Sequence, residues 1–214
     1  MKNKKTYYLM ILDRSGSMQD CVQETINGFN EQIQMIRDLQ LRFPEQEFQI
    51  SLTTFNHEVE HPFEMTNVNY VKELSLHSYI PSGSTALLDA IGDAVSRLKA
   101  SAMDEISRDE ATAVVVILTD GHENASREFT HQQIGDLIKE LEKTGSWSFS
   151  YLGATIDAVD VAEKMNISRR NSVVYKKSET GKVYTDLANS FMHYAEAKSE
   201  GRTMSDFLNT EEEA

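Results

Sequence analysis

The sequence predicts an α/β fold, in which a doubly wound, mostly parallel sheet of six strands has helices on both faces. Three observations support this fold class. Short apolar runs alternate along the chain with longer stretches whose apolar residues recur every three or four positions. The run AVVVIL at residues 113–118 is apolar throughout, which is typical of a central strand covered on both faces. Turn residues and helix-capping patterns separate these segments.

The first strand is expected at residues 7–12, where the apolar run YYLMIL stops at Asp13. A long helix is expected at residues 20–42, and the pair Asp20 and Gln23 indicates its N-terminal cap. Its buried face follows from the helical spacing of Val22, Ile26, Phe29, Ile33 and Ile36.

The middle of the chain continues the alternation. Residues 48–55 form the second expected strand, and residues 57–65 a shorter extended piece that returns as a hairpin. A loose helical stretch covers residues 68–78. Pro81 and Gly83 then form a loop before a helix that starts at Ser84 or Thr85. The inner face of that helix consists of Leu87, Leu88, Ile91, Ala94, Val95 and Leu98.

The second half repeats the pattern around the central strand. Thr130 and Gln133 form a capping-box pattern, which predicts a helix start at this point. The inward residues of this helix are Ile134, Leu137, Ile138 and Leu141. The remaining expected elements are strands at 149–152 and 172–175 and helices at 158–166 and 183–199.

The chain shows no internal repeat and no linker, so we expect one domain over residues 5–198. Residues 199–214 end in the acidic sequence TEEEA, and we expect this tail to be disordered.

Composition narrows the classes of function. The formal net charge of −13 repels phosphate backbones and disfavours a nucleic-acid partner. The sequence has no Gly-rich phosphate-binding motif, so no nucleotide is expected. A lone cysteine, Cys21, rules out an intrachain disulfide framework, and the sequence has neither an export signal nor an apolar stretch of membrane-spanning length. We therefore expect a soluble cytoplasmic protein with no membrane contact.

Polar residues follow two of the expected strands. Asp13, Ser15 and Ser17 come directly after the first strand, and Asp120 follows the central one. Ligands of open parallel sheets bind beyond the carboxyl ends of the strands. Residues i and i+2 of an extended loop point the same way, so Asp13, Ser15 and Ser17 are expected to face one point. Together with Thr85, at the start of a helix, they offer only oxygen ligands, which favour Mg²⁺, then Mn²⁺ or Ca²⁺.

At these residues the chain resembles the von Willebrand factor type A domain, the fold shared with integrin inserted domains. The metal-ion-dependent adhesion site of that family is an Asp-x-Ser-x-Ser loop, a distant Thr and a distant Asp. It matches Asp13-Arg14-Ser15-Gly16-Ser17, Thr85 in SGSTALLDA and Asp120 in LTDGHEN. The resemblance covers roughly residues 5–195 and implies a Rossmann-like sheet of strand order 3-2-1-4-5-6 with one antiparallel edge strand.

The resemblance also implies a role for each matched residue. Ser15 and Ser17 would coordinate the ion directly. Thr85 and Asp120 would alternate between direct and water-mediated contact, and Asp13 would accept hydrogen bonds from the loop and from water on the ion. The open coordination position would be taken by a carboxylate of a partner protein, whose identity the sequence does not indicate.

The same residues are also compatible with three other interpretations. Asp13, Ser15 and Ser17 could form a turn and a helix cap. Asp13 could also be the nucleophile of a Mg²⁺-dependent phosphoryl hydrolase or transferase, although such enzymes usually place a second carboxylate where this chain has Ser15. In a third interpretation the metal only stiffens the loops of a structural subunit.

The sequence His57-Glu58-x-x-His61 has the spacing of a zinc-protease helix. Pro62 disfavours helical geometry at the preceding residue, so we expect an edge strand at this point instead.

Overall fold

A computed structural model describes residues 5–202, 204 and 206–208 of the chain, and in this part six strands form one sheet. The strands are β1 (Lys5–Asp13), β2 (Glu47–Phe55), β3 (Val59–Asn67), β4 (Ala111–Thr119), β5 (Trp147–Gly153) and β6 (Ser172–Val174). Their order is β3-β2-β1-β4-β5-β6, and every pair is parallel except β2–β3. The predicted fold class and strand order are confirmed.

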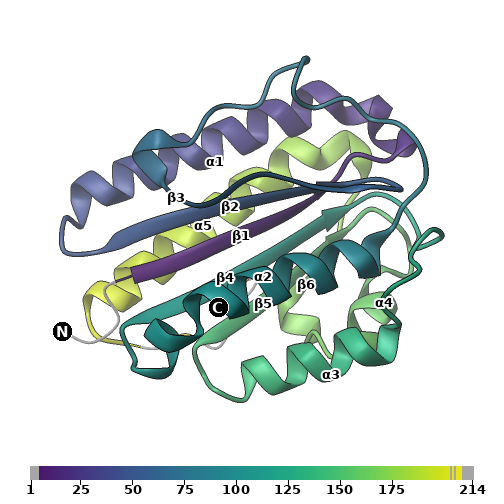
Figure 1. Ribbon diagram of the computed structural model, residues 1–214. Helices are drawn as coiled ribbons and strands as arrows, with labels where there is room; N and C mark the ends of the chain where they lie inside the picture. The colour runs from purple at the N-terminus through teal and green to yellow at the C-terminus, as the bar shows by residue number, and fades with distance from the viewer. Residues whose placement is uncertain (1–4, 203, 205, 209–214) are drawn as a thin grey trace, which may run out of the picture.

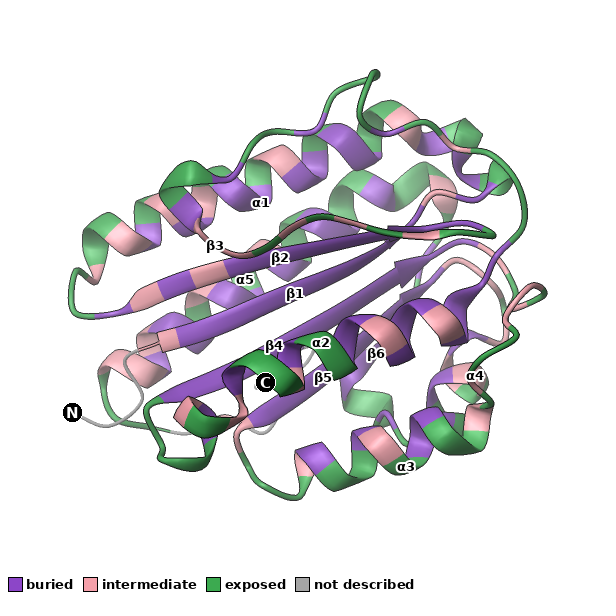
Figure 2. Cartoon of the chain, viewed as in Figure 1, coloured by how far each residue is buried: buried purple, intermediate pink, exposed green. Residues whose placement is uncertain are grey.

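Helices cover both faces of the sheet (Figure 1). They are α1 (Val22–Arg42), α2 (Leu87–Ser107), α3 (His131–Glu142), α4 (Ala158–Lys164) and α5 (Thr180–Ser199). Alternate residues of β1 point to opposite faces of the sheet. Tyr8 and Met10 pack with α1 and α5 on one face, and Leu9 and Ile11 pack with α2 on the other. The central strands are buried along their length (Figure 2), as the apolar run in β4 predicts.

Two expected helical features differ from the structure. A 3₁₀ turn, Gly16–Cys21, precedes α1, and Asp20 does not cap the helix. The segment 68–78 forms only a short 3₁₀ turn, Val68–Tyr70.

Side chains of α1 explain the second difference. Arg37 donates to the carbonyl oxygens of Val68 and Val71, and Asn30 bonds both backbone groups of Leu74. These side chains form the hydrogen bonds that the backbone groups of this segment would form with one another in a helix.

Two further expected helix starts, at residues 130 and 84–85, have different outcomes. Thr130 and Gln133 form a capping box at the start of α3, as predicted. The helix expected from Ser84 or Thr85 begins later, at Leu87. Thr85 is held in the loop instead, because its amide donates to Asn124 Oδ1 and its carbonyl accepts from the Asn124 amide.

The packed core extends past the expected boundary at residue 198 into the segment expected to be disordered. Phe207 and Leu208 are buried in the cluster formed by α1, α5 and the sheet. The amide of Leu208 donates to Asn171 Oδ1 at 3.2 Å, which fixes this segment beside β6. The acidic end, residues 209–214, lies outside the described residues.

A largely buried lysine, Lys198, joins the end of α5 to the amino-terminal edge of the sheet. Its ammonium donates to the Lys5 carbonyl at 2.7 Å and to the hydroxyls of Thr6 and Thr112 at 2.7 and 2.8 Å. None of these acceptors carries a charge, and burial lowers the pKa of Lys198 to about 7.

This lysine makes stability depend on pH. The pKa of an unfolded lysine is about 10.4, so between pH 7 and 10 the unfolded chain binds more protons at this position than the folded chain does. Stability due to Lys198 therefore rises with pH in that window. We expect urea unfolding to show a gain of the order of 1–2 kcal/mol from pH 7 to pH 9 in the wild type relative to Lys198→Met. Equal pH dependence in the two proteins would contradict this expectation.

Candidate metal site at the carboxyl edge of the sheet

The carboxyl ends of β1 and β4 meet at one edge of the sheet, because the two strands are parallel neighbours. Each strand ends beside an aspartate, and the 3₁₀ turn after β1 and the loop before α2 reach the same edge. All the predicted site residues lie on these segments: Asp13, Ser15, Ser17, Thr85 and Asp120.

Three hydroxyl groups converge beside Gly121. A β-carbon placed on this glycine would lie 3.2 Å from Thr85 Oγ1, 3.5 Å from Ser17 Oγ and 3.8 Å from Ser15 Oγ. The two serine hydroxyls are 3.1 Å apart. Gly121 therefore leaves a small space that side chains from two separate segments border, the loop after β1 and the loop before α2.

Asp120 faces the same group of hydroxyls. Its Oδ1 accepts a hydrogen bond from Ser17 Oγ at 2.6 Å. Its Oδ2 is buried, and no aligned donor reaches it within the described part of the chain. The ammonium of Lys177 lies 2.6 Å from Oδ2 as an ion pair. Burial lowers the pKa of Lys177, but the contact with Asp120 outweighs burial and raises it, so the ammonium stays charged at neutral pH.

Asp13 has a different environment, because both of its carboxylate oxygens accept hydrogen bonds. The Ser15 amide donates to Oδ1 at 2.6 Å and the Thr119 hydroxyl to Oδ2 at 2.5 Å. Burial raises the pKa of Asp13 to about 6, while the bonds from Thr119 and Ser15 lower it in part. Asp13 therefore braces the loop that presents Ser15 and Ser17.

Backbone hydrogen bonds hold the contributing loops against one another. The Gly16 amide donates to the Gly83 carbonyl at 3.0 Å, and the Ser82 amide to the Arg14 carbonyl at 2.9 Å. The bond from the Thr85 amide to Asn124 is 2.9 Å long. Asn124 therefore braces the loop that contains Thr85.

Sequence reasoning missed three contributors to this edge. Thr119 could have been found, because it is the last residue of β4 and precedes Asp120 directly. Tyr79, whose hydroxyl donates to the Asp13 carbonyl at 2.5 Å, lies far away in sequence. Lys177 is also distant, and no spacing pattern links either residue to the motif.

The family model of the von Willebrand factor type A domain matches residues 9–189 of this chain. The chain belongs to this family. A comparison with curated proteins finds no match to it.

Solved structures with the type A architecture resemble this domain at low sequence identity. The von Willebrand factor domain of the pilus tip protein Mfa5 from Porphyromonas gingivalis has a TM-score of 0.65 and 9% identity, over 90% of this chain and 97% of that one. Manganese-loaded TRAP protein of Plasmodium vivax gives 0.53 and 15%, over 86% and 73%. These likenesses show the fold alone.

A mussel byssus protein, proximal thread matrix protein 1, was solved with a zinc-occupied metal-ion-dependent adhesion site. Its TM-score is 0.56 and its identity 16%, over 87% of this chain and 45% of that one. This chain thus spans less than half the length of the mussel protein.

The donor set of this type A domain fits a hard divalent cation. The groups around Gly121 are three hydroxyls and a carboxylate, and Asp120 Oδ2 has a charged partner rather than an aligned hydrogen bond. Among the described residues, no cluster of three or more His, Cys, Asp or Glu side chains provides a competing metal site.

The zinc-protease spacing of the type A domain does not form a helix. His61 lies on β3, where its ring nitrogens contact Thr53 Oγ1 at 2.9 Å and Asp93 Oδ2 at 2.7 Å. His57 lies before the strand, in the turn after β2. As predicted, this part of the chain is an edge strand.

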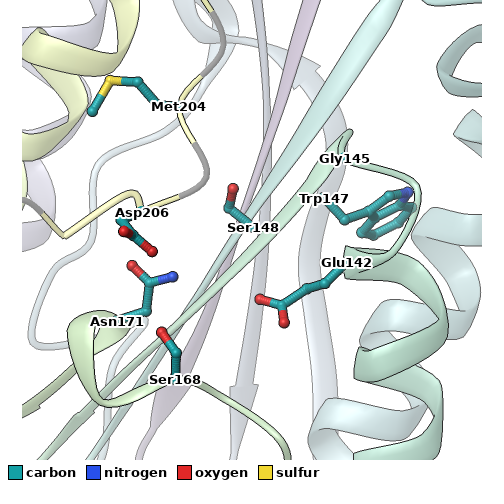
Figure 3. Close-up of a pocket in the computed structure, with 8 residues that line it drawn as sticks. All are labelled: Glu142, Gly145, Trp147, Ser148, Ser168, Asn171, Met204 and Asp206. Atoms are coloured by element: carbon teal, nitrogen blue, oxygen red, sulfur yellow. The ribbon is translucent and has the colours of Figure 1, made fainter.

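A polar cavity of about 380 Å³ lies at the opposite end of β5, away from the predicted site. Figure 3 shows the polar ends of Glu142 and Asn171 directed toward one space, while the indole of Trp147 points away from it. None of the predicted site residues lines this cavity. In the described part of the type A domain, no helix has the length and apolar character needed to cross a membrane.

Proposed function

We propose that this type A domain is a protein-interaction module that binds partners through a divalent cation at the carboxyl edge of its sheet. The observation that carries the proposal is the convergence of three hydroxyls and Asp120 around Gly121. Ser15, Ser17, Thr85 and Asp120 would hold the ion, and Asp13 would orient the loop that presents the two serines. Ser17 is exposed, so the site is open to a second molecule.

A bound cation would supply a Lewis-acidic position that a carboxylate of a partner protein can occupy. The oxygen-only donor set favours Mg²⁺, with Mn²⁺ or Ca²⁺ as substitutes. The zinc-occupied and manganese-loaded relatives support a divalent ion in general rather than magnesium in particular.

The surface beside the site has room for a partner. A cleft of about 600 Å³ lies against the loops that contain Ser84 and Asn124, next to Thr85. Charged side chains of both signs line it, including Glu58, Arg127 and Glu128. We propose that a carboxylate of the partner coordinates the metal ion, and that neighbouring side chains of the partner contact this cleft.

The structure disfavours the phosphoryl-transfer alternative. Asp13 is fully buried and both of its oxygens accept hydrogen bonds, so the carboxylate is poorly placed to attack phosphorus. Arg14 is the basic residue of the Asp13–Ser17 loop, and it forms an ion pair with Glu60 at 2.5 Å rather than facing the site as a phosphate-binding group would. We therefore propose a binding function rather than an enzymatic one.

We infer that the protein works in a reducing compartment, the cytoplasm. The chain has one cysteine, Cys21, and its side chain is buried, so nothing here resembles the disulfide frameworks of oxidising compartments. The acidic net charge supports a partner other than nucleic acid.

The test is capture of proteins from an extract of the source cells by the immobilised chain of residues 1–214. We expect a partner to bind in Mg²⁺, to elute in EDTA and to be absent from the Asp120→Asn column. Asp160→Asn, on the exposed side of α4, makes the same change in charge and serves as the matched control. Capture that persists in EDTA and with Asp120→Asn would exclude the metal-dependent mode. A melting temperature that rises with Mg²⁺ without any captured partner would favour the purely stabilising role.

A further inference from the structure

The ammonium group of Lys177 contacts the proposed metal site. Lys177 begins a 3₁₀ turn, Lys177–Glu179, which leads from β6 into α5. Its ammonium lies 2.6 Å from Asp120 Oδ2 and donates to the main-chain carbonyl of Ser17 at 3.0 Å. It thus contacts two of the residues that the proposed function assigns to the ion.

The Lys177 ammonium contacts Oδ2 of Asp120, which is the carboxylate oxygen available to a metal ion. Ser17 Oγ already donates to Oδ1, so Oδ2 is the oxygen without an aligned hydrogen bond. The side chain of Asp120 is fully buried, whereas that of Lys177 is 35% exposed. The carboxylate is therefore fixed, and the lysine is the partner that can withdraw into solvent.

We propose that Lys177 competes with the divalent cation for Asp120 and is displaced from Oδ2 when the ion binds. The proposal rests on the proposed function, because it assigns the ion to the same carboxylate. Two positive charges close to one buried carboxylate repel each other, and this repulsion is large where water is partly excluded. Lys177 thereby lowers the affinity of the site for metal.

The competition also has a structural consequence that can be measured without any partner. The ammonium ties the segment from β6 to α5 to the end of β4 through Asp120 and to the loop after β1 through the Ser17 carbonyl. When the lysine leaves, that tie is lost and the amine becomes more accessible to reagents in solution.

The first experiment measures Mg²⁺ affinity of the full chain by calorimetric titration at pH 7.5. We expect Lys177→Met to bind Mg²⁺ about tenfold more tightly than the wild type, a factor that corresponds to ~1.4 kcal/mol. Lys177→Arg keeps the charge and should bind like the wild type. Lys176→Met removes a charge from the neighbouring exposed position and should change the affinity little.

The second experiment tests displacement itself. The wild-type chain is treated briefly with an amine-acetylating reagent, with Mg²⁺ or with EDTA, and acetylation at Lys177 and Lys176 is quantified by peptide mass spectrometry. We expect Mg²⁺ to increase acetylation of Lys177 relative to Lys176. Circular dichroism of each variant in EDTA verifies that the fold is kept.

The outcomes separate this inference from the proposed function. An unchanged or weaker affinity in Lys177→Met overturns the competition, and unchanged acetylation of Lys177 in Mg²⁺ overturns the displacement. In both cases the metal site stands if Asp120→Asn loses Mg²⁺ binding. If Asp120→Asn binds Mg²⁺ as the wild type does, the proposed function fails as well.

Discussion

Magnesium affinity is expected to fall by at least about 100-fold in Asp120→Asn, while the fold is kept. Asparagine preserves the size of the side chain and its hydrogen bond from Ser17, but it removes the negative charge that Asp120 places beside the hydroxyls. A hard cation binds an amide oxygen much more weakly than a charged carboxylate. Calorimetric titration of the full chain measures the change.

The comparison needs a variant with the same loss of charge elsewhere. Asp160→Asn on α4 fulfils this condition and should bind Mg²⁺ as the wild type does. Asp13 is a less suitable position for this test, because its replacement leaves the Ser15 amide and the Thr119 hydroxyl without their acceptor. Retention of wild-type affinity in Asp120→Asn would mean that the ion, if bound at all, is held elsewhere.

Phe207→Ala is expected to lower the free energy of unfolding by about 3–5 kcal/mol, the usual cost of removing a fully buried phenylalanine. The Phe207 ring packs against three other rings, with centroid distances of 5.8 Å to Tyr194, 6.0 Å to Phe191 and 6.5 Å to Tyr8. Its deletion leaves a cavity between α5 and β1 that these neighbours can refill only in part.

Urea denaturation followed by fluorescence measures this loss. Leu41→Ala on α1 is the matched control, because Leu41 is 81% exposed and its truncation should change stability by less than ~0.5 kcal/mol. A loss below about 1 kcal/mol in Phe207→Ala would show that the segment after α5 does not belong to the core.

The fold could be predicted from the sequence because its signals are local. The apolar run in β4 and the helical spacing in α1 each lie within one element, and the side-chain period assigns each to its structure type. The edge strand β3 followed from Pro62, which a helix would not accept at that point.

The failures occurred where distant residues decide the structure. The segment after β3 lacks a helix because Arg37 and Asn30 of α1 bind its backbone groups. Phe207 lies in a short polar stretch near the end of the chain, and only its aromatic neighbours from β1 and α5 explain its burial.

The candidate site likewise has a part that could be predicted from the sequence and a part that could not. Asp13, Ser15 and Ser17 are recognisable together because their spacing of two is local, and strand ends place Asp120 beside them. Lys177 reaches Asp120 from the connection between β6 and α5, which no sequence period reports. Its position follows from tertiary structure alone.

The backbone bonds between the loops limit how this edge can evolve or be engineered. The amide of Gly16 and the carbonyl of Arg14 each pair with the segment before α2, which in turn is held by Asn124. Transplanting the Asp-x-Ser-x-Ser peptide into another scaffold would therefore transfer its oxygen atoms without the spacing between them. The three segments are held as one structural unit, so a change that moves the backbone of one segment also moves the oxygen atoms that the other two present.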